Sequence, residues 1–184
     1  SWWIAFIGLI SMIIGYLYTG GPLPIAYTPF GELFSGLLMG TVIIGISYFI
    51  QTMTITKEVI FISIPIAIFI GAILLSNNIR DLDNDKESGR KTIAILLGKE
   101  NAIKFLQLLF IVAYLLTIFF IGFGMLPLLA IISFLSIKKA IEVIQGFHKG
   151  QTPIEMMAPM AATGKTNTIY GLLLGLSLLI TSFI

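Results

Sequence analysis

A cluster of acidic, basic and amide side chains occupies residues 77–92, directly after a long apolar run. Asp81, Asp83 and Asp85 alternate with other residues there and are surrounded by cations. Ionisable groups beside a membrane span are costly to keep, so they are candidates for function by default. Carboxylates and substrate phosphate oxygens are the ligands that Mg²⁺ prefers. The cluster therefore predicts a site for a divalent metal and a polyanion.

Helical spacing predicts which of these side chains lie together. If the preceding helix continues through the cluster, Asn77, Asp81 and Asp85 form one stripe, with about 6 Å of rise between neighbours. Carboxylates four residues apart on a helix repel each other, so a cation bound between Asp81 and Asp85 would relieve this repulsion. Asp83 faces the other way and is the weaker candidate. We therefore predict Asp81 and Asp85 as the metal ligands.

Amide and basic side chains of the same segment complete the predicted site. Asn77 and Asn78 supply hydrogen-bonding groups without adding charge. Arginine and lysine pair with carboxylates or with the oxygens of a diphosphate. The candidate cations are Arg80, Lys86, Arg90 and Lys91.

Two simpler interpretations of the cluster are a solvated, charge-balanced loop and a calcium-binding EF-hand. The three aspartates fit the first three ligand positions of an EF-hand loop. Lys86 stands where that loop requires glycine, and Thr92 stands where it requires a bidentate glutamate. The EF-hand interpretation therefore fails at two defining positions, whereas the solvated loop stays open.

The composition places the cluster in a membrane protein. Of the 184 residues, 57% are hydrophobic and only 11% are charged, and the mean hydropathy is +1.01. The chain has no cysteine and a single histidine, His148, which excludes thiolate sites and a histidine metal cluster within one chain. The net charge is +2, and basic residues are not interleaved with aromatic ones, so nothing indicates nucleic acid as a partner.

The apolar segments predict an all-α, polytopic membrane helix bundle with six transmembrane helices in one domain, residues 1–184. A span needs about 17–25 apolar residues, and a Gly-rich turn divides one run that is too long. The centres of the predicted helices carry no charged side chain, which argues against a transporter or channel, the alternative from another functional class. The predicted helices cover residues 1–18, 32–50, 58–77, 101–121, 126–145 and 168–184.

The alternation of six helices places the three longest loops, 19–31, 78–100 and 146–167, on one side of the membrane. Of the 11 lysines and arginines, all except Lys57 lie nearest to that side. Cytoplasmic loops carry an excess of these residues. We therefore predict a multi-pass protein of the cell membrane, embedded in the lipid bilayer, with its polar loops in the cytoplasm.

Two glycine patterns and one threonine predict local features of the helices. The patterns Gly36-x-x-x-Gly40 and Gly171-x-x-x-Gly175 predict close packing between helices. Thr92 is predicted to be a local helix cap or a turn former rather than a nucleophile.

Two segments resemble known motifs. Asn77 to Thr92 has the pattern Asn-Asn-x-Arg-Asp-x-x-x-Asp-x-x-x-Gly-x-x-Thr and resembles the second aspartate-rich motif of the UbiA-type intramembrane prenyltransferases. Tyr18 to Glu32 resembles a loop typical of the branch of that family that prenylates 1,4-dihydroxy-2-naphthoate. The family fold has nine helices around a central cavity, and the resemblance implies that this chain supplies the fourth to the ninth. The family's first motif, Asn-x-x-x-Asp-x-x-x-Asp, has no counterpart here, so we expect a fragment of a longer protein.

The resemblance also implies a reaction. It is the Mg²⁺-dependent transfer of a polyprenyl group from polyprenyl diphosphate to 1,4-dihydroxy-2-naphthoate, with loss of the carboxylate, as a step of menaquinone biosynthesis. Another aromatic acceptor is the close alternative. Asp81 and Asp85 would bind the metal and, with Arg80, form the catalytic set. The two substrates would contact Asn77, Asn78, Lys86, Arg90, Lys91, Tyr18, Tyr27 and Glu32. We expect the 184 residues alone to be inactive, because half of the metal site is absent.

Overall fold

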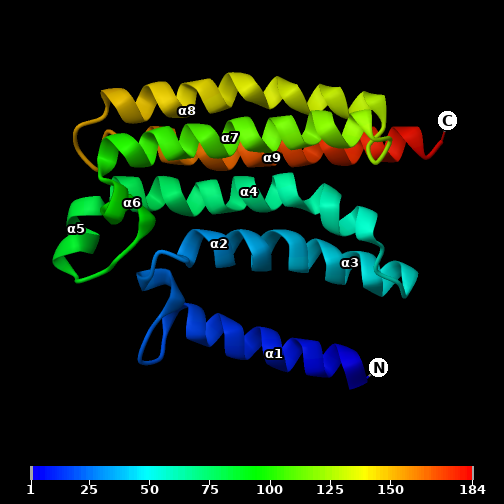
Figure 1. Ribbon diagram of the computed structural model, residues 1–184, viewed down its shortest axis with the longest axis horizontal. Coiled ribbons are helices and arrows are strands. Elements are labelled where there is room, and N and C mark those ends of the chain that lie inside the picture. The colour runs from blue at the N-terminus through cyan, green and yellow to red at the C-terminus, as the bar shows by residue number, and fades with distance from the viewer. Residues whose placement is uncertain (1, 184) are drawn as a thin grey trace.

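The computed structural model describes residues 2–183, which form helices joined by short loops (Figure 1). The all-α class predicted from the sequence is confirmed. The elements in chain order are α1 (Trp2–Thr19), the 3₁₀ helix η1 (Ile25–Tyr27), α2 (Gly31–Gly36), the π-helical η2 (Leu37–Val42), α3 (Ile43–Thr52), α4 (Lys57–Arg80), α5 (Leu82–Glu87), α6 (Ile93–Leu97), α7 (Lys99–Gly122), the 3₁₀ helix η3 (Leu128–Ser136), α8 (Ile137–Lys149) and α9 (Met157–Thr181).

Three helical segments are long and apolar enough to cross a membrane: Gly31–Thr52, Lys57–Arg80 and Lys99–Gly122. A fourth apolar helix, Ala5–Thr19, is shorter. Within residues 2–183 these segments support three of the six predicted spans by length and composition. The remaining two predicted spans correspond to η3 with α8 and to α9, which carry more polar residues.

The last helix begins much earlier than predicted. Hydropathy placed its start at residue 168, whereas α9 starts at Met157. The first turns contain several threonines together with Lys165 and Asn167, which lower their hydropathy without preventing a helix. Their hydroxyl groups bond inside the helix: Thr163 Oγ1 donates to Pro159 O at 3.1 Å and Thr166 Oγ1 to Ala162 O at 2.9 Å. These polar groups are therefore satisfied locally, and the expected loop 146–167 is short.

Two lysines lie near the middle of a helical segment that was expected to have an uncharged centre. The segment predicted over 126–145 is a 3₁₀ helix up to Ser136 and then continues as α8 to Lys149. Lys138 and Lys139 therefore stand near its middle, and Lys139 Nζ donates to Glu142 Oε2 at 2.5 Å. The prediction of charge-free helix centres is wrong for this segment, and the argument that it offered against a transport protein is lost.

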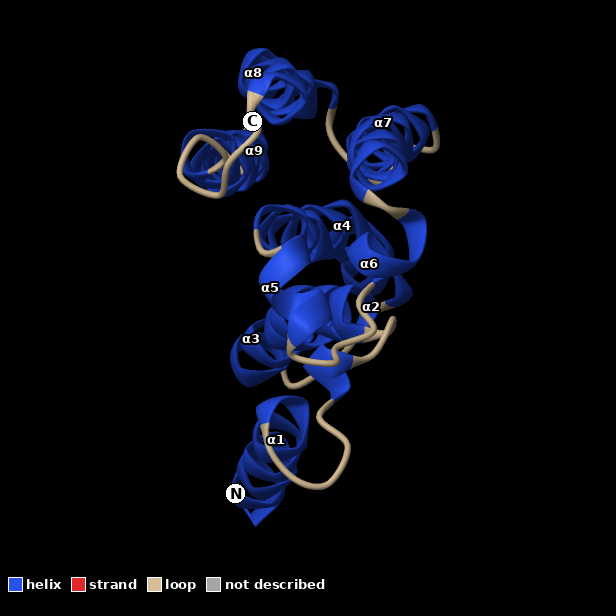
Figure 2. Ribbon diagram, turned by 90° about the vertical axis from the view of Figure 1, so that its left-hand side faces the viewer, coloured by secondary structure: helices blue, strands red, loops and turns tan. Residues whose placement is uncertain are grey.

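The long helices lie side by side in antiparallel order (Figure 1). Seen end-on, α1 stands at one edge, α2 and α3 come next, and α4 separates them from α7, α8 and α9 (Figure 2). Phe69 of α4 is fully buried, and its ring centroid lies 4.6 Å from that of Tyr170 and 5.4 Å from that of Tyr114. Such aromatic contacts add to the free energy gained from burial. The core therefore centres on α4, the helix that leads into the polar cluster.

Small residues let α2 and η2 approach α4 closely. A Cβ atom at Gly36 would lie 2.4 Å from the carbonyl oxygen of Ala67, and one at Gly40 would lie 2.6 Å from Ala67 Cα. The predicted close packing at Gly36 and Gly40 is therefore confirmed. At Gly171 and Gly175 an added Cβ would meet nothing within 4 Å in the described part of the chain, so the second pattern has no close-packed neighbour among these residues and stays a prediction.

The polar connections gather at one end of the bundle. The loop that contains η1, the short helices α5 and α6, and the loop between α8 and α9 lie together there, while the start of α1 and the end of α9 lie at the opposite end (Figure 1). This arrangement brings the segments 20–30 and 81–98 close to each other, as the helix alternation predicted.

Candidate functional site

The helix that carries the acidic cluster is interrupted at Asp81. α4 ends at Arg80 and α5 starts at Leu82, with Asp81 at φ −95° and ψ 10° between them. The prediction of one continuous helix through the cluster is therefore wrong at this residue. The four-residue spacing survives the break, because Asp81 N donates to Asn77 O at 3.0 Å and Asp85 N donates to Asp81 O at 2.8 Å.

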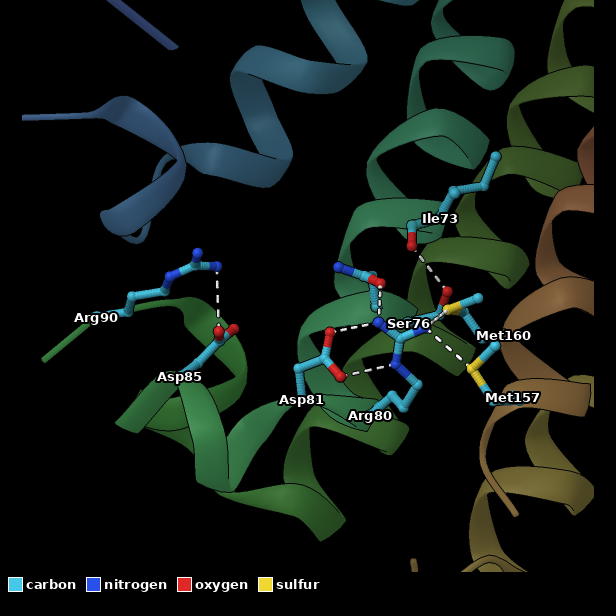
Figure 3. Close-up of polar contacts among 9 residues, drawn as sticks. Ile73, Ser76, Arg80, Asp81, Asp85, Arg90, Met157 and Met160 are labelled. Atoms are coloured by element: carbon cyan, nitrogen blue, oxygen red, sulfur yellow. Dashed lines mark hydrogen bonds and ion pairs between the residues drawn. The ribbon is translucent and has the colours of Figure 1, made fainter. Parts of the chain in front are cut away.

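Arg80 holds the first carboxylate (Figure 3). Its Nε donates to Asp81 Oδ1 at 2.7 Å, and its Nη2 donates both to Asp81 Oδ2 and, at 2.8 Å, to Asn77 Oδ1. A two-pronged arginine–carboxylate pair of this kind fixes both groups in orientation. The third nitrogen, Nη1, contacts the sulfur atoms of Met160 at 2.8 Å and Met157 at 3.2 Å, both on α9. Sequence reasoning missed these methionines, because nothing local marks them as neighbours of an arginine.

The second carboxylate pairs with a different cation. Asp85 is only 7% exposed, and its Oδ1 lies 3.1 Å from Arg90 Nη1. Its other oxygen, Oδ2, is buried and has no hydrogen-bond partner among the described residues. Burial raises the pKa of the Asp85 carboxyl, and the positive charge of Arg90 opposes that rise. The predicted stripe of Asn77, Asp81 and Asp85 is therefore divided between two arginines.

These groups fit a divalent cation. Two carboxylates and an amide oxygen are donors that Mg²⁺ accepts, while waters and phosphate oxygens complete its shell. The buried, unpartnered Oδ2 of Asp85 is an oxygen that a cation would satisfy. Within residues 2–183 no set of three acidic or histidine side chains is arranged to hold a metal. The assignment of Asp81 and Asp85 as metal ligands therefore stays a prediction. The side chain of Asp83, the weaker candidate, is exposed.

A tight turn after α5 places Arg90 beside Asp85. Gly89 has φ +74°, and the backbone N–H of Arg90 donates to Asp85 O at 3.0 Å while that of Gly89 donates to Lys86 O at 3.1 Å. This arrangement is a Schellman-type helix end, in which glycine takes the left-handed position. Thr92 then caps α6, since its hydroxyl accepts from Ile95 N at 3.4 Å, as predicted.

Replacing Gly89 with alanine is expected to loosen this turn. The space around the position is open, so only the backbone conformation is at stake. A left-handed alanine costs about 1–2 kcal/mol, which corresponds to roughly 5- to 30-fold faster amide hydrogen exchange over residues 82–92. Gly89→Asn should give a smaller change, because asparagine tolerates this conformation better. Equal exchange rates in wild type and in Gly89→Ala would contradict the turn.

A buried pair joins α2 to α4 next to the cluster. Asn78 Nδ2 donates to Glu32 Oε1 at 2.9 Å, and the two residues are 3% and 5% exposed. The other carboxylate oxygen of Glu32 is buried and finds no partner in the described structure. Tyr18, from the end of α1, donates its hydroxyl to Gly31 O at 3.3 Å. Glu32, Asn78 and Tyr18 thus connect three helices at the polar end of the bundle.

The predicted substrate-binding residues fall into contacting and exposed groups. The ring of Tyr27 lies 4.3 Å below the guanidinium carbon of Arg90, so these two predicted residues are together. The side chains of Lys86 and Lys91 are exposed. Lys91 takes part through its backbone, since its N–H donates to Tyr27 O at 2.8 Å.

The fold and this site define a helical membrane protein with a carboxylate and arginine cluster at one end of an apolar bundle. Residues 1–153 match the UbiA prenyltransferase family, and the chain belongs to that family. The resemblance inferred from the two motifs is confirmed, and membership implies a polytopic membrane fold.

Curated relatives support the same family. The chain is 52% identical over 183 residues to the 1,4-dihydroxy-2-naphthoate octaprenyltransferase of Bacillus subtilis (strain 168), covering 100% of this chain and 59% of that protein. It is 32% identical over 171 residues to the UbiA prenyltransferase domain-containing protein 1 homolog of Drosophila melanogaster, covering 92% of this chain and 45% of that protein. No solved structure matches the chain.

Proposed function

We propose that this chain forms part of an enzyme that transfers a polyprenyl group from polyprenyl diphosphate to 1,4-dihydroxy-2-naphthoate. The observation that carries the proposal is the 52% identity over the whole chain to a protein with that activity in its name. The chain spans 59% of that relative's length. The proposal therefore includes a further part of the protein that supplies the family's first aspartate-rich motif.

The roles of the clustered residues follow from their chemistry. Asp81 and Asp85 would hold Mg²⁺, which supplies positive charge to a departing diphosphate. Arg80 and Arg90 carry N–H donors that suit phosphate oxygens as well as carboxylates. Arg90 Nε is buried and has no acceptor among residues 2–183, so it is a donor that an anionic oxygen would satisfy. The exposed Lys86 and Lys91 add positive charge at the same end of the bundle.

The apolar part of the bundle suits the rest of the donor substrate. A groove of about 410 Å³ lies between α1 and the α2–η2–α3 segment, and a groove of this size would hold several isoprene units. Its walls are apolar, and Tyr18 and Ser35 lie along it. The tail would lie in such a groove or in lipid, with the charged head at the polar end. The proposed orientation places this end in the cytoplasm, where a soluble aromatic acid is available.

The reaction would break the bond between the allylic carbon and the diphosphate oxygen. A bond between that carbon and the aromatic ring would form, and the ring would lose its carboxylate as carbon dioxide. Diphosphate would leave with its negative charge balanced by the cations of the site. The prenylated product would belong to the menaquinone pathway.

An assay of membranes that contain the full-length protein tests the proposal. The membranes would be incubated with octaprenyl diphosphate, 1,4-dihydroxy-2-naphthoate and Mg²⁺, and the prenylated product measured by mass spectrometry. We expect product formation that EDTA abolishes and added Mg²⁺ restores. A parallel assay with 4-hydroxybenzoate in place of the naphthoate tests whether the enzyme prenylates a different aromatic acceptor. The proposal is wrong if the naphthoate is not prenylated while a control prenyltransferase is active under the same conditions.

A further inference from the structure

Tyr27 connects the loop between α1 and α2 to the acidic segment by two separate contacts. Its carbonyl oxygen accepts from Lys91 N at 2.8 Å, and its ring lies 4.3 Å from the guanidinium carbon of Arg90. The ring is 40% exposed, so it is not buried in the apolar core. An arginine over the face of an aromatic ring is attracted by the ring's negative quadrupole. The side chain of Tyr27 thus makes a cation–π contact with Arg90.

Arg90 is held from two directions, and one of its donors has no acceptor in the described structure. Tyr27 covers one face of the guanidinium group, and Nη1 lies 3.1 Å from Asp85 Oδ1. Nε is buried and has no acceptor in the described structure. The Schellman turn at Gly89 fixes the backbone of Arg90, but not the long side chain. The ring of Tyr27 restrains the side chain of Arg90 in addition.

We propose that Tyr27 is a positioning residue that holds the Arg90 guanidinium beside Asp85, where its N–H donors bind a diphosphate oxygen. The contact uses the face of the guanidinium group and leaves the N–H edges for anions, which is why an aromatic ring suits this position. The inference rests on the proposed function, because that function supplies the diphosphate. The loop that carries Tyr27 thereby takes part in donor-substrate binding from a segment more than fifty residues away along the chain.

Three variants of the full-length protein separate this role from a structural one. Tyr27→Leu removes the aromatic face, Tyr27→Phe keeps the face and removes the hydroxyl, and Tyr48→Leu makes the same change in α3. The first measurement is KM and kcat for octaprenyl diphosphate in membranes. The second is the rate of trypsin cleavage after Arg90 and Lys91, relative to cleavage after the exposed Lys149 at the end of α8.

We expect Tyr27→Leu to raise KM for the diphosphate by about two- to tenfold, the size of a cation–π contact, with a smaller change in kcat. It should also speed cleavage after Arg90 and Lys91. Tyr27→Phe and Tyr48→Leu should stay within about twofold of wild type in both measurements.

Two outcomes would overturn the proposal. Tyr27→Leu could match wild type in both measurements, or Tyr27→Phe could be as impaired as Tyr27→Leu, which would assign the effect to the hydroxyl. If wild type transfers no prenyl group, the proposed function fails. The trypsin rates of the same variants then still decide whether Tyr27 holds Arg90 in place.

Discussion

Replacing Asp81 with alanine in the full-length protein is expected to lower prenyl transfer at least about a hundredfold. Asp81 is one of the two carboxylates proposed to hold Mg²⁺. Its two oxygens also accept two donors of Arg80, which contacts Asn77 and the methionines of α9 as well. The substitution would therefore remove a metal ligand and release a cation from its fixed orientation. Product formation at increasing Mg²⁺ concentration measures the effect.

Asp83→Ala is the matched control for this prediction. Asp83 lies two residues further along the chain, in α5, and its side chain is exposed. Its loss removes the same charge from the same end of the bundle without removing a proposed ligand. We expect transfer within about twofold of wild type, since exposed charges contribute little. Wild-type turnover of Asp81→Ala at saturating Mg²⁺ would refute the assignment of Asp81.

Protein folding must be measured alongside activity, because Asp81 has a structural partner. Arg80 is mostly buried, with 18% of its side chain exposed, so removing Asp81 leaves a cation with fewer partners. Thermal unfolding of the detergent-solubilised protein shows how much of the activity loss comes from instability. Asp81→Asn keeps the shape and one acceptor, and it should remain folded but inactive.

Gly36→Val is expected to destabilise the bundle strongly. A Cβ atom there would lie 2.4 Å from Ala67 O and 3.2 Å from Ala67 C. Both are backbone atoms of α4, so the clash is relieved only if α2 moves away from α4. Overpacking of this kind costs about 1–3 kcal/mol, and the movement would also disturb the Glu32–Asn78 pair one turn away. We expect a lower midpoint of thermal unfolding in detergent by several degrees and a loss of activity.

Gly175→Val tests whether the effect comes from the contact rather than from the substitution. An added Cβ at Gly175 meets nothing within 4 Å in the described residues, and valine favours a helix slightly more than glycine does. This variant should unfold within a degree or two of wild type. Equal midpoints for Gly36→Val and Gly175→Val would show that α2 and α4 do not pack as closely as described.

Local patterns in the sequence predicted much of the architecture. The polar cluster interrupts an apolar chain, and that contrast alone marked residues 77–92 as the candidate site. Gly36 and Gly40 predicted close packing, which Ala67 of α4 provides. These predictions succeeded because burial, helix periodicity and capping depend on residues that are near one another in the chain.

Other expectations failed where hydropathy is a poor guide to helix limits. The first turns of α9 are too polar to be recognised as part of a span, yet their threonines bond inside the helix. Lys138 and Lys139 came to lie near the middle of a segment because η3 and α8 together extend to Lys149. The break at Asp81 had no local signal such as proline or glycine.

The sequence by itself determined the helical class, the place of the charged cluster and the family. Only the tertiary structure decided how the charges are shared: Asp81 with Arg80, Asp85 with Arg90, and Glu32 with Asn78. The contact of Tyr27 with Arg90 and that of Arg80 with two methionines of α9 also come from segments distant in the chain. A charged group takes whichever partner packing brings within reach, and helix periodicity carries no information about that choice.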